Sequence, residues 1–265
     1  PEPFDTPVKG NPVEYLHDNT VADITRALGG SIPFWDEMAA HPDYDSWWQQ
    51  RSALNATHDI RPAILMVGGL FDAEDLYGTW NIYRAIRQNN PQTDCRIVMG
   101  PWTHGAWRSN GDANAVGHIR FSEESLSQFY RHQVEFPFFD HYLRDAEHSG
   151  ATTTGALIFF SGENCWREME GWDPENQSRP HTLYLAEGGS LTTAPSDISE
   201  AYSFYTSDPN DPVPYYPDMP WPRRKEYMTV GQEFLDGRHD VLTFLSPRLE
   251  NDMAVIGPIG SVRCV

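Results

Sequence analysis

Two runs of apolar residues, each ending in glycine, organise the first half of the chain. They cover residues 63–69 (AILMVGG) and 95–100 (CRIVMG). Continuous apolar runs of this length are typical of strands in a parallel sheet that is covered on both faces. Between them, apolar side chains recur at spacings of three and four, at Leu76, Trp80, Tyr83 and Ile86. The pattern predicts a strand, a crossover helix and a second, parallel strand.

Amphipathic helices are predicted on either side of this unit. In residues 19–30, Asn19 or Thr20 can cap a short helix that ends at the glycine pair closing the segment. Residues 123–136 also carry apolar side chains at helical spacing. Pro137 is expected to end or kink that helix, because proline lacks an N–H and its ring clashes with the preceding turn. A second short helical piece is expected after it.

The pattern changes beyond Gly150. Short alternating segments at 155–160, 181–186 and 202–206 are separated by glycine, proline and asparagine turns, which is typical of antiparallel strands. Residues 207–222 are dense in proline, which cannot donate to a central ladder, so a long surface loop is expected there. This half of the chain predicts a β domain of sandwich or jelly-roll type.

Composition narrows the class of protein. The 265 residues are 39% hydrophobic and 13% aromatic, which favours a folded protein of more than one structural unit. The formal net charge of -19 argues against nucleic acid or an anionic membrane as partner and would attract a cationic substrate. No apolar run is long enough to span a bilayer, and the N-terminus has no signal-peptide pattern.

Neither a disulfide framework nor a metal site is predicted. Cys95, Cys165 and Cys264 are too few and too far apart for either, so three unpaired, buried thiols are expected. The histidines show no metal-ligand spacing, and no Walker or dinucleotide-binding pattern occurs. We therefore expect no metal and no cofactor.

One aspartate and one histidine each follow a predicted strand. Asp72 lies in GGLFDAEDLYG (68–78) and His104 in IVMGPWTHGAW (97–107). The ligand crevice of an open α/β sheet lies beyond the carboxyl ends of its strands. A histidine there can accept and return a proton near neutral pH, while a carboxylate fixes its tautomer. Either residue alone is more often structural, but the pair in this order predicts the acid and base of a catalytic triad, within hydrogen-bonding reach.

The nucleophile of such a triad is not found in the sequence. In an α/β-hydrolase it is a serine on a G-x-S-x-G turn upstream of the acid and the base. No such turn occurs: no strand precedes Ser31, and Ser190 comes after His104. We interpret the chain as the C-terminal portion of a serine hydrolase that lacks its nucleophile segment, and we expect the isolated chain to be inactive.

Residues beside the acid and base offer contacts to substrate. Glu74 and Asp75 add two carboxylates within three residues of Asp72, and close like charges repel unless a cation or donors join them. A substrate ammonium group is one such cation. The alternative is helix capping, with Asp72 as N-cap and Asp75 at the third helical position. Trp102 and Trp107 either wall an acyl pocket or pack in the core.

These motifs resemble those of the α-amino acid ester hydrolases, within a wider group that includes cocaine esterase-type and X-Pro dipeptidyl-peptidase-type acyl hydrolases. The residues that carry the resemblance are 68–78 and 98–105, with HPDYDSWWQQRS upstream and GENCWREMEGW and YTSDPNDPVPY downstream. The resemblance spans most of the chain. It implies that Asp72 and His104 are the triad acid and base, and that Glu74 and Asp75 belong to a carboxylate cluster that holds the substrate α-ammonium group.

The resemblance also implies a domain order. Residues 1–50 would be the remnant of a helical cap, 51–150 the C-terminal part of an α/β-hydrolase core, and 151–265 an incomplete β-sandwich or jelly roll. The serine, an oxyanion-hole tyrosine and a third cluster carboxylate would lie upstream. The missing N-terminal hydrolase segment is therefore an expected partner.

The function predicted is acyl transfer from an ester or β-lactam-type amide that bears a free α-amino group. A small molecule with that group is the expected substrate partner, with Trp102 as one of its contacts. Two alternatives stay open: an esterase, amidase or X-Pro peptidase without α-amino specificity, and a β-sandwich module that binds carbohydrate or a partner domain. Self-association into a homo-oligomer and the cellular compartment are left open as well.

Overall fold

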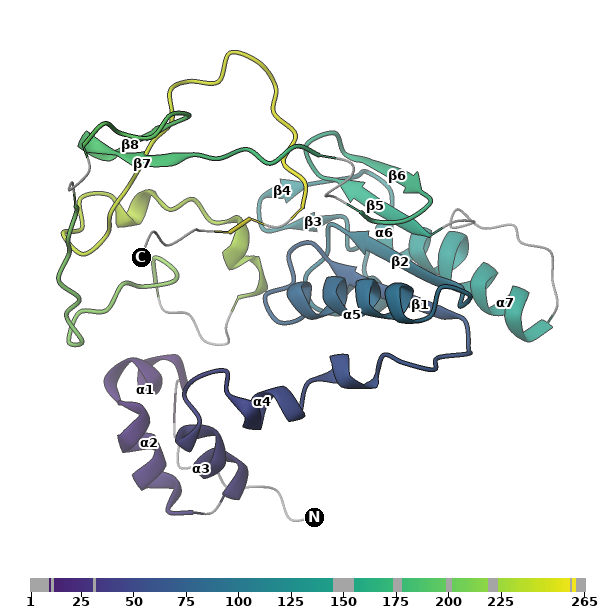
Figure 1. Cartoon of the computed structure of the whole chain (residues 1–265), viewed down its shortest axis with the longest axis horizontal. Helices are drawn as coiled ribbons and strands as arrows, with labels where there is room; N and C mark the ends of the chain where they lie inside the picture. Colours follow the sequence, from purple (N-terminus) through teal and green to yellow (C-terminus); the bar gives the residue numbers. More distant parts are fainter. Residues whose placement is uncertain are drawn as a thin grey trace. The chain divides into compact units, whose positions relative to one another are not determined.

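The structure is a computed structural model (Figure 1). Its chain divides into two compact units. It describes residues 10, 12–30, 32–144, 155–173, 178–198, 202–218, 224–257 and 259–260. The first unit combines Pro1–Gly171 with Pro214–Val230, and the second combines Trp172–Val213 with Gly231–Val265. Domain boundaries near residues 50 and 150 stay a prediction.

In the part of the chain that the structure describes, four short α-helices precede the first strand, and strands and helices are mixed after it. The strands are β1 (Ile64–Gly69), β2 (Cys95–Gly100), β3 (Ala115–Val116), β4 (Ile119–Arg120), β5 (Ala156–Phe160), β6 (Cys165–Met169), β7 (Tyr184–Ala186) and β8 (Ser190–Thr192). The α-helices are α1 (Pro12–Asp18), α2 (Val21–Leu28), α3 (Pro33–Ala40), α4 (Ser46–Gln50), α5 (Leu76–Asn89), α6 (Leu126–Phe129) and α7 (Phe136–Arg144). The described residues also contain a π-helix, η3 (Tyr130–Glu135), and the 3₁₀ turns η1 (Ala53–Ala56), η2 (Ala106–Arg108), η4 (Glu187–Gly189), η5 (Lys225–Thr229) and η6 (Glu233–Leu235).

A four-stranded sheet in the order β1-β2-β5-β6 forms the centre of the first unit. β1 and β2 run parallel, with Ile64 opposite Cys95 and Gly69 opposite Gly100, and α5 is the crossover between them. The strand-helix-strand unit predicted from the apolar runs is therefore confirmed.

β5 differs from the prediction. The segment at 155–160 was expected to open an antiparallel β domain, yet β5 pairs parallel with β2, and only β6 returns antiparallel to it. Residues 156–159 are all at most 3% exposed, so this strand is covered on both faces. A strand buried in this way has the continuous apolar composition of β1 and β2 and lacks the alternation of a half-exposed strand.

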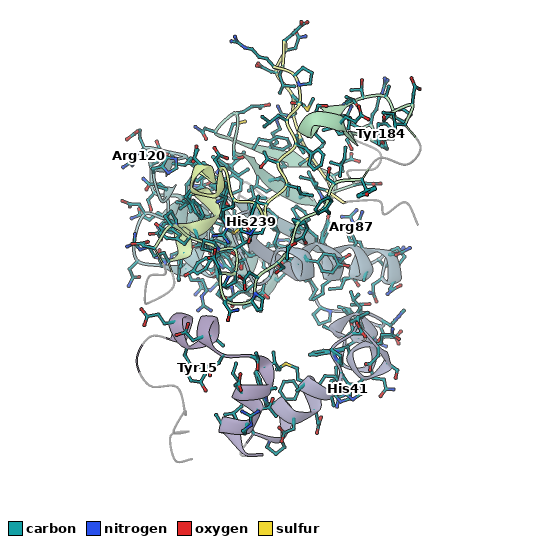
Figure 2. The ribbon with its side chains drawn as sticks, turned by 90° about the vertical axis from the view of Figure 1, so that its left-hand side faces the viewer. Tyr15, His41, Arg87, Arg120, Tyr184 and His239 are labelled. Atoms are coloured by element: carbon teal, nitrogen blue, oxygen red, sulfur yellow. The ribbon has the colours of Figure 1, made fainter. Side chains whose placement is uncertain are left out.

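Helix α5 covers one face of the sheet. Its Thr79 lies beside Met99 of β2 where both approach Gly68, and the Tyr83 hydroxyl donates to the carbonyl of Gly155 over 3.1 Å. Arg87, labelled in Figure 2, extends this contact by donating to the carbonyl of Glu170 over 3.4 Å. The crossover helix is thus fixed to β2 and to the ends of both later strands.

The segment from α6 to α7 covers the opposite face. Its buried core cluster includes Val98, Leu157 and Phe159 from the sheet and Leu126, Tyr130 and Val134 from the helices. Arg96 of β2 binds Asp94 through two of its nitrogens and lies near the rings of Phe138 and Tyr142 in α7. The hydrophobic effect and one charge-assisted pair together hold this helical layer on the sheet.

Of the two outcomes predicted for Pro137, an end or a kink of the helix, the structure contradicts the first. α6 continues into the π-helical η3, in which the N–H of Phe136 donates to the carbonyl of Arg131, five residues back. Pro137 is then the second residue of α7. The change from π to α geometry places proline in a first turn, where a missing N–H is tolerated.

The predicted short helix near the N-terminus is confirmed, with Thr20 as its cap. The Thr20 hydroxyl accepts from the N–H of Asp23, and the Asp23 carboxylate accepts from the N–H of Thr20. This is a capping box, which satisfies two N–H groups reciprocally. Gly29 ends the helix in the left-handed conformation.

The described part of the second unit contains one hairpin, β7–β8. Residue 245 extends it, because the carbonyl of Leu245 accepts from Leu191 and the N–H of Leu245 donates to Gly189. Strands of a complete jelly roll are not among the described residues of this unit, so that domain type stays a prediction.

Two expectations from composition can be examined directly. No helix that the structure describes has the length and apolar character to cross a membrane. Cys95 and Cys165 are unpaired, as expected, but Cys165 is only partly buried. Burial raises the pKa of the Cys95 thiol to about 11. Cys264 lies outside the described residues.

Two glycines let the chain approach Trp102 closely. A Cβ atom at Gly69 would overlap the carbonyl oxygen of Trp102, and one at Gly100 would lie 2.5 Å from its indole ring. The N–H of Phe71 donates to that same carbonyl over 3.0 Å. Only glycine at the end of β1 permits this contact between the segments that follow β1 and β2.

We expect Gly69→Ala to lower the free energy of unfolding by about 2–4 kcal/mol, because the clash involves backbone and cannot be relieved by a side-chain rotation. Gly78→Ala in α5 is the matched control. Its Cβ would meet nothing within 4 Å, so helix propensity should stabilise that variant by about 0.5–1 kcal/mol. Urea unfolding midpoints measure both changes, and equal midpoints for Gly69→Ala and wild type would contradict the close-approach argument.

Candidate active site

Asp72 is a buried carboxylate held by the turn that follows β1. Its side chain is 1% exposed. The backbone N–H of Asp72 donates to the carbonyl of Gly69, which turns the chain out of the strand. Its Oδ1 accepts from the N–H of Glu74 over 2.8 Å and from that of Asp75 over 3.1 Å. The beginning of the crossover segment therefore binds this carboxylate before the helix starts.

The surroundings of Asp72 favour its charged form. Burial by itself would raise the pKa of the carboxyl, because the anion loses its water. The backbone N–H groups of Glu74 and Asp75, together with His104, outweigh that effect and hold the pKa below its ordinary value. Asp72 is consequently an anionic acceptor throughout the neutral pH range.

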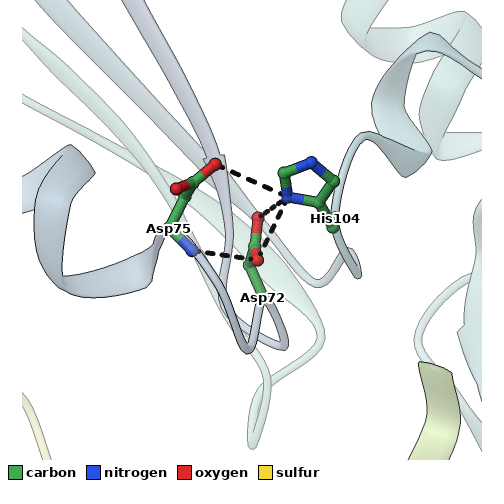
Figure 3. Close-up of side chains that lie close together, drawn as sticks. All are labelled: Asp72, Asp75 and His104. Atoms are coloured by element: carbon green, nitrogen blue, oxygen red, sulfur yellow. Dashed lines mark hydrogen bonds and ion pairs between the residues drawn. The ribbon is translucent and has the colours of Figure 1, made fainter. Parts of the chain in front are cut away.

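His104 meets this carboxylate from the loop after β2 (Figure 3). Its Nδ1 lies 3.0 Å from Oδ2 and 3.3 Å from Oδ1 of Asp72. The histidine side chain is 48% exposed, and Figure 3 shows its other ring nitrogen on the side away from the carboxylates. A carboxylate at Nδ1 favours the tautomer that carries its proton there and leaves Nε2 free to accept one.

The structure places Asp75 beside His104 as well. Asp75 Oδ2 lies 3.5 Å from His104 Nδ1. Asp75 is the N-cap residue of α5, but its side chain makes no capping hydrogen bond. One part of the capping alternative holds, because the Asp72 carboxylate accepts from the N–H groups of Glu74 and Asp75. The other part does not, because Asp75 lies before the helix and not at its third position. Glu74 is exposed and lies on the same turn.

Trp102 is part of the core, although we predicted it as a substrate contact. Its side chain is 1% exposed and packs against the rings of Trp107, Tyr130 and Trp166. Its burial has a physical reason, because the backbone at Gly69 and Gly100 packs directly against it. Core packing, the other reading of this residue, is what the structure supports.

Within the part of the chain that the structure describes, Asp72, Asp75 and His104 also form a group that could hold a metal ion. One ligand atom from each lies within 4.8 Å of the others. However, Asp72 Oδ1 already accepts two backbone N–H groups, and the 3.0 Å separation of Oδ2 and Nδ1 is a direct hydrogen bond. We therefore interpret the cluster as an arrangement for proton transfer.

Two features of the site were missed at the level of sequence. The first is the glycine requirement at Gly69 and Gly100, for which the repeated apolar-run-then-glycine pattern was a signal. The second is the orientation of Asp75 toward His104, which depends on the torsion angles of one turn. No sequence pattern that we used encodes those angles.

Comparisons with known proteins show which proteins the chain is similar to. Residues 8–106 match the family described as X-Pro dipeptidyl-peptidase (S15 family). Among curated proteins, the chain is similar to the cocaine esterase of Rhodococcus sp. (strain MB1 Bresler). The two are 26% identical over 250 residues, which make up 88% of this chain and 41% of the esterase.

Two solved structures share the fold. An aminopeptidase from the marine sediment archaeon Thaumarchaeota archaeon superposes with a TM-score of 0.75 at 32% identity, over 89% of this chain and 39% of its own. An α-amino acid ester hydrolase labelled with selenomethionine gives a TM-score of 0.76 at 29% identity, over 91% of this chain and 41% of its own.

The chain spans about two fifths of the length of each of these relatives. The mixed sheet with helices on both faces confirms the predicted α/β class. The resemblance predicted from the sequence is confirmed over that part: the chain is similar to the α/β-hydrolase-like acyl hydrolases of the cocaine esterase, α-amino acid ester hydrolase and X-Pro dipeptidyl-peptidase group.

Proposed function

We propose that this chain carries the acid and base of a serine-type acyl hydrolase. The observation that carries the proposal is the hydrogen bond between a buried, ionised Asp72 and a half-exposed His104. In this arrangement Nε2 takes the proton of an attacking hydroxyl and returns it to the leaving group, while Asp72 stabilises the imidazolium. The similarity to an esterase and to hydrolases of peptides and amino acid esters supports the same class of reaction.

The nucleophile is proposed to come from outside these residues. In the described part of the chain, His104 has hydrogen-bonding contacts with carboxylates alone and with no hydroxyl group. Acyl-enzyme chemistry needs a serine beside the histidine and an oxyanion hole, which α/β-hydrolases build partly from the N–H that follows the serine. We propose that both belong to a segment upstream of Pro1 in the complete hydrolase.

The proposed substrate is an ester, or a β-lactam-type amide, with a free α-amino group. Glu74 is exposed, and the Asp75 side chain is 67% exposed, so both residues lie at the surface on the turn that carries the buried acid. A protonated amine can accept their charge in charge-assisted hydrogen bonds. The formal net charge of -19 favours approach of a cation over an anion.

We expect the purified 265-residue chain to hydrolyse no α-amino ester above background and to form no adduct with a fluorophosphonate probe. When the upstream segment is included, hydrolysis is expected, and Asp72→Asn should lower kcat by about 10⁴-fold because it favours the wrong tautomer of His104. Asp112→Asn is the matched control, since Asp112 is exposed and its carboxylate makes no hydrogen bond or ion pair among the described residues. A stoichiometric serine adduct on the chain alone, with turnover lost in His104→Ala, would place the nucleophile within these residues.

The α-amino preference is expected to depend on Glu74 and Asp75. In the complete hydrolase, the double variant Glu74→Gln, Asp75→Asn should lower the ratio of kcat/KM for an amino ester over its des-amino analogue by roughly tenfold or more, because each charge-assisted hydrogen bond contributes about 1.5–3 kcal/mol. The ratio cancels any effect of the variant on His104. An unchanged ratio would instead favour an esterase, amidase or X-Pro peptidase without α-amino specificity.

A second candidate function is carbohydrate binding by the second unit. Tyr202, Phe204 and Tyr205 are more than half exposed, and the first two rings lie 6.3 Å apart. Exposed aromatic patches of this kind are typical of binding surfaces. Affinity electrophoresis through gels containing neutral polysaccharide should retard the chain and should not retard Phe204→Ala. Equal mobility with and without polysaccharide would exclude this candidate.

A further inference from the structure

Asp75 faces His104 although nothing in its helical role requires it. It precedes the first residue of α5, a position where an aspartate side chain normally accepts a backbone N–H. Here the side chain makes no such bond, and its Oδ2 lies 3.5 Å from Nδ1 of His104. The orientation of the Asp75 carboxylate is therefore not set by hydrogen bonds to the N–H groups of α5.

The two aspartates act on His104 in different ways. The single Nδ1–H of the ring goes to Asp72, whose Oδ2 is at 3.0 Å. At 3.5 Å, Asp75 is too far for a good hydrogen bond but close enough for a strong charge interaction with an imidazolium. Asp72 and Asp75 are the charged groups that face this ring from the described elements around it, namely the turn after β1 and the start of α5.

We propose that Asp75 is a positioning residue for His104, in addition to its contact with substrate. Its charge joins that of Asp72 in stabilising the imidazolium that forms when the base takes a proton. The inference deepens the function proposed above and rests on it. The Asp75 carboxylate then serves both in binding the substrate ammonium group and in proton transfer by His104.

The exposure of Asp75 makes this double role feasible. With 67% of its side chain exposed, Asp75 can keep Oδ2 near Nδ1 while its other oxygen contacts an ammonium group. Asp72 cannot do the same, because its side chain is buried and Oδ1 is bound by two N–H groups. The structure thus gives the two carboxylates separate tasks.

The test uses the complete hydrolase and an ester without an α-amino group, so that ammonium binding plays no part. We expect Asp75→Asn to lower kcat about two- to fivefold with KM unchanged, which is the range for a partly exposed ion pair. The acidic limb of the kcat profile should move to lower pH, because the imidazolium loses a stabilising charge. Asp75→Glu should restore most of the rate, and the control Asp112→Asn should match wild type.

The outcomes separate this inference from the proposed function. If Asp75→Asn lowers the amino preference but leaves kcat and the pH profile for the des-amino ester unchanged, Asp75 serves substrate alone and the inference is overturned. If the profile moves while the parent shows no amino preference, the action of Asp75 on His104 stands, and the proposed substrate and the shared ammonium contact are wrong. If no ester is turned over, an NMR titration decides: His104 resonances that titrate at the same pH in Asp75→Asn and wild type overturn it.

Discussion

The close backbone approach between the segments that follow β1 and β2 is the constraint on which the candidate site depends. The N–H of Leu70 donates to Gly100, and that of Phe71 donates to Trp102, so the strand pairing continues past the end of the sheet. Trp102 is packed into the core on its far side. Asp72 and His104 therefore start from two loops whose separation is fixed by backbone hydrogen bonds and by the absence of a side chain at Gly69.

The same segment that builds the crossover also sets the charge of the acid. Burial alone would raise the pKa of the Asp72 carboxyl, because desolvation penalises the anion. The N–H groups of Glu74 and Asp75 counter that effect immediately before α5 begins. The fold and the electrostatics of the site are consequently determined by one short turn, and a change to the turn affects both.

Periodicity was a reliable guide where it matched burial. β1, α5 and β2 were predicted from two apolar runs and one helical spacing, and the loop positions of Asp72 and His104 followed from them, although only β2 is buried along its whole length. β5 was assigned to the wrong layer, because a short apolar run does not say which sheet it joins. The passage of the helix through Pro137 and the direction of Asp75 depend on local backbone torsions that composition does not report.

The acid and base lie only 32 positions apart in the chain, on one strand-helix-strand unit. Their relative geometry therefore depends on this one unit. Recombination or circular permutation at positions outside the unit would leave the geometry of Asp72 and His104 unchanged. Insertions in the loop between the C-terminal end of α5 and β2 should also leave the geometry of the pair unchanged, since long surface insertions cost little in chain entropy. In evolutionary terms, such a unit can be joined to different nucleophile-bearing and substrate-covering segments, so that new specificities arise without rebuilding the proton relay.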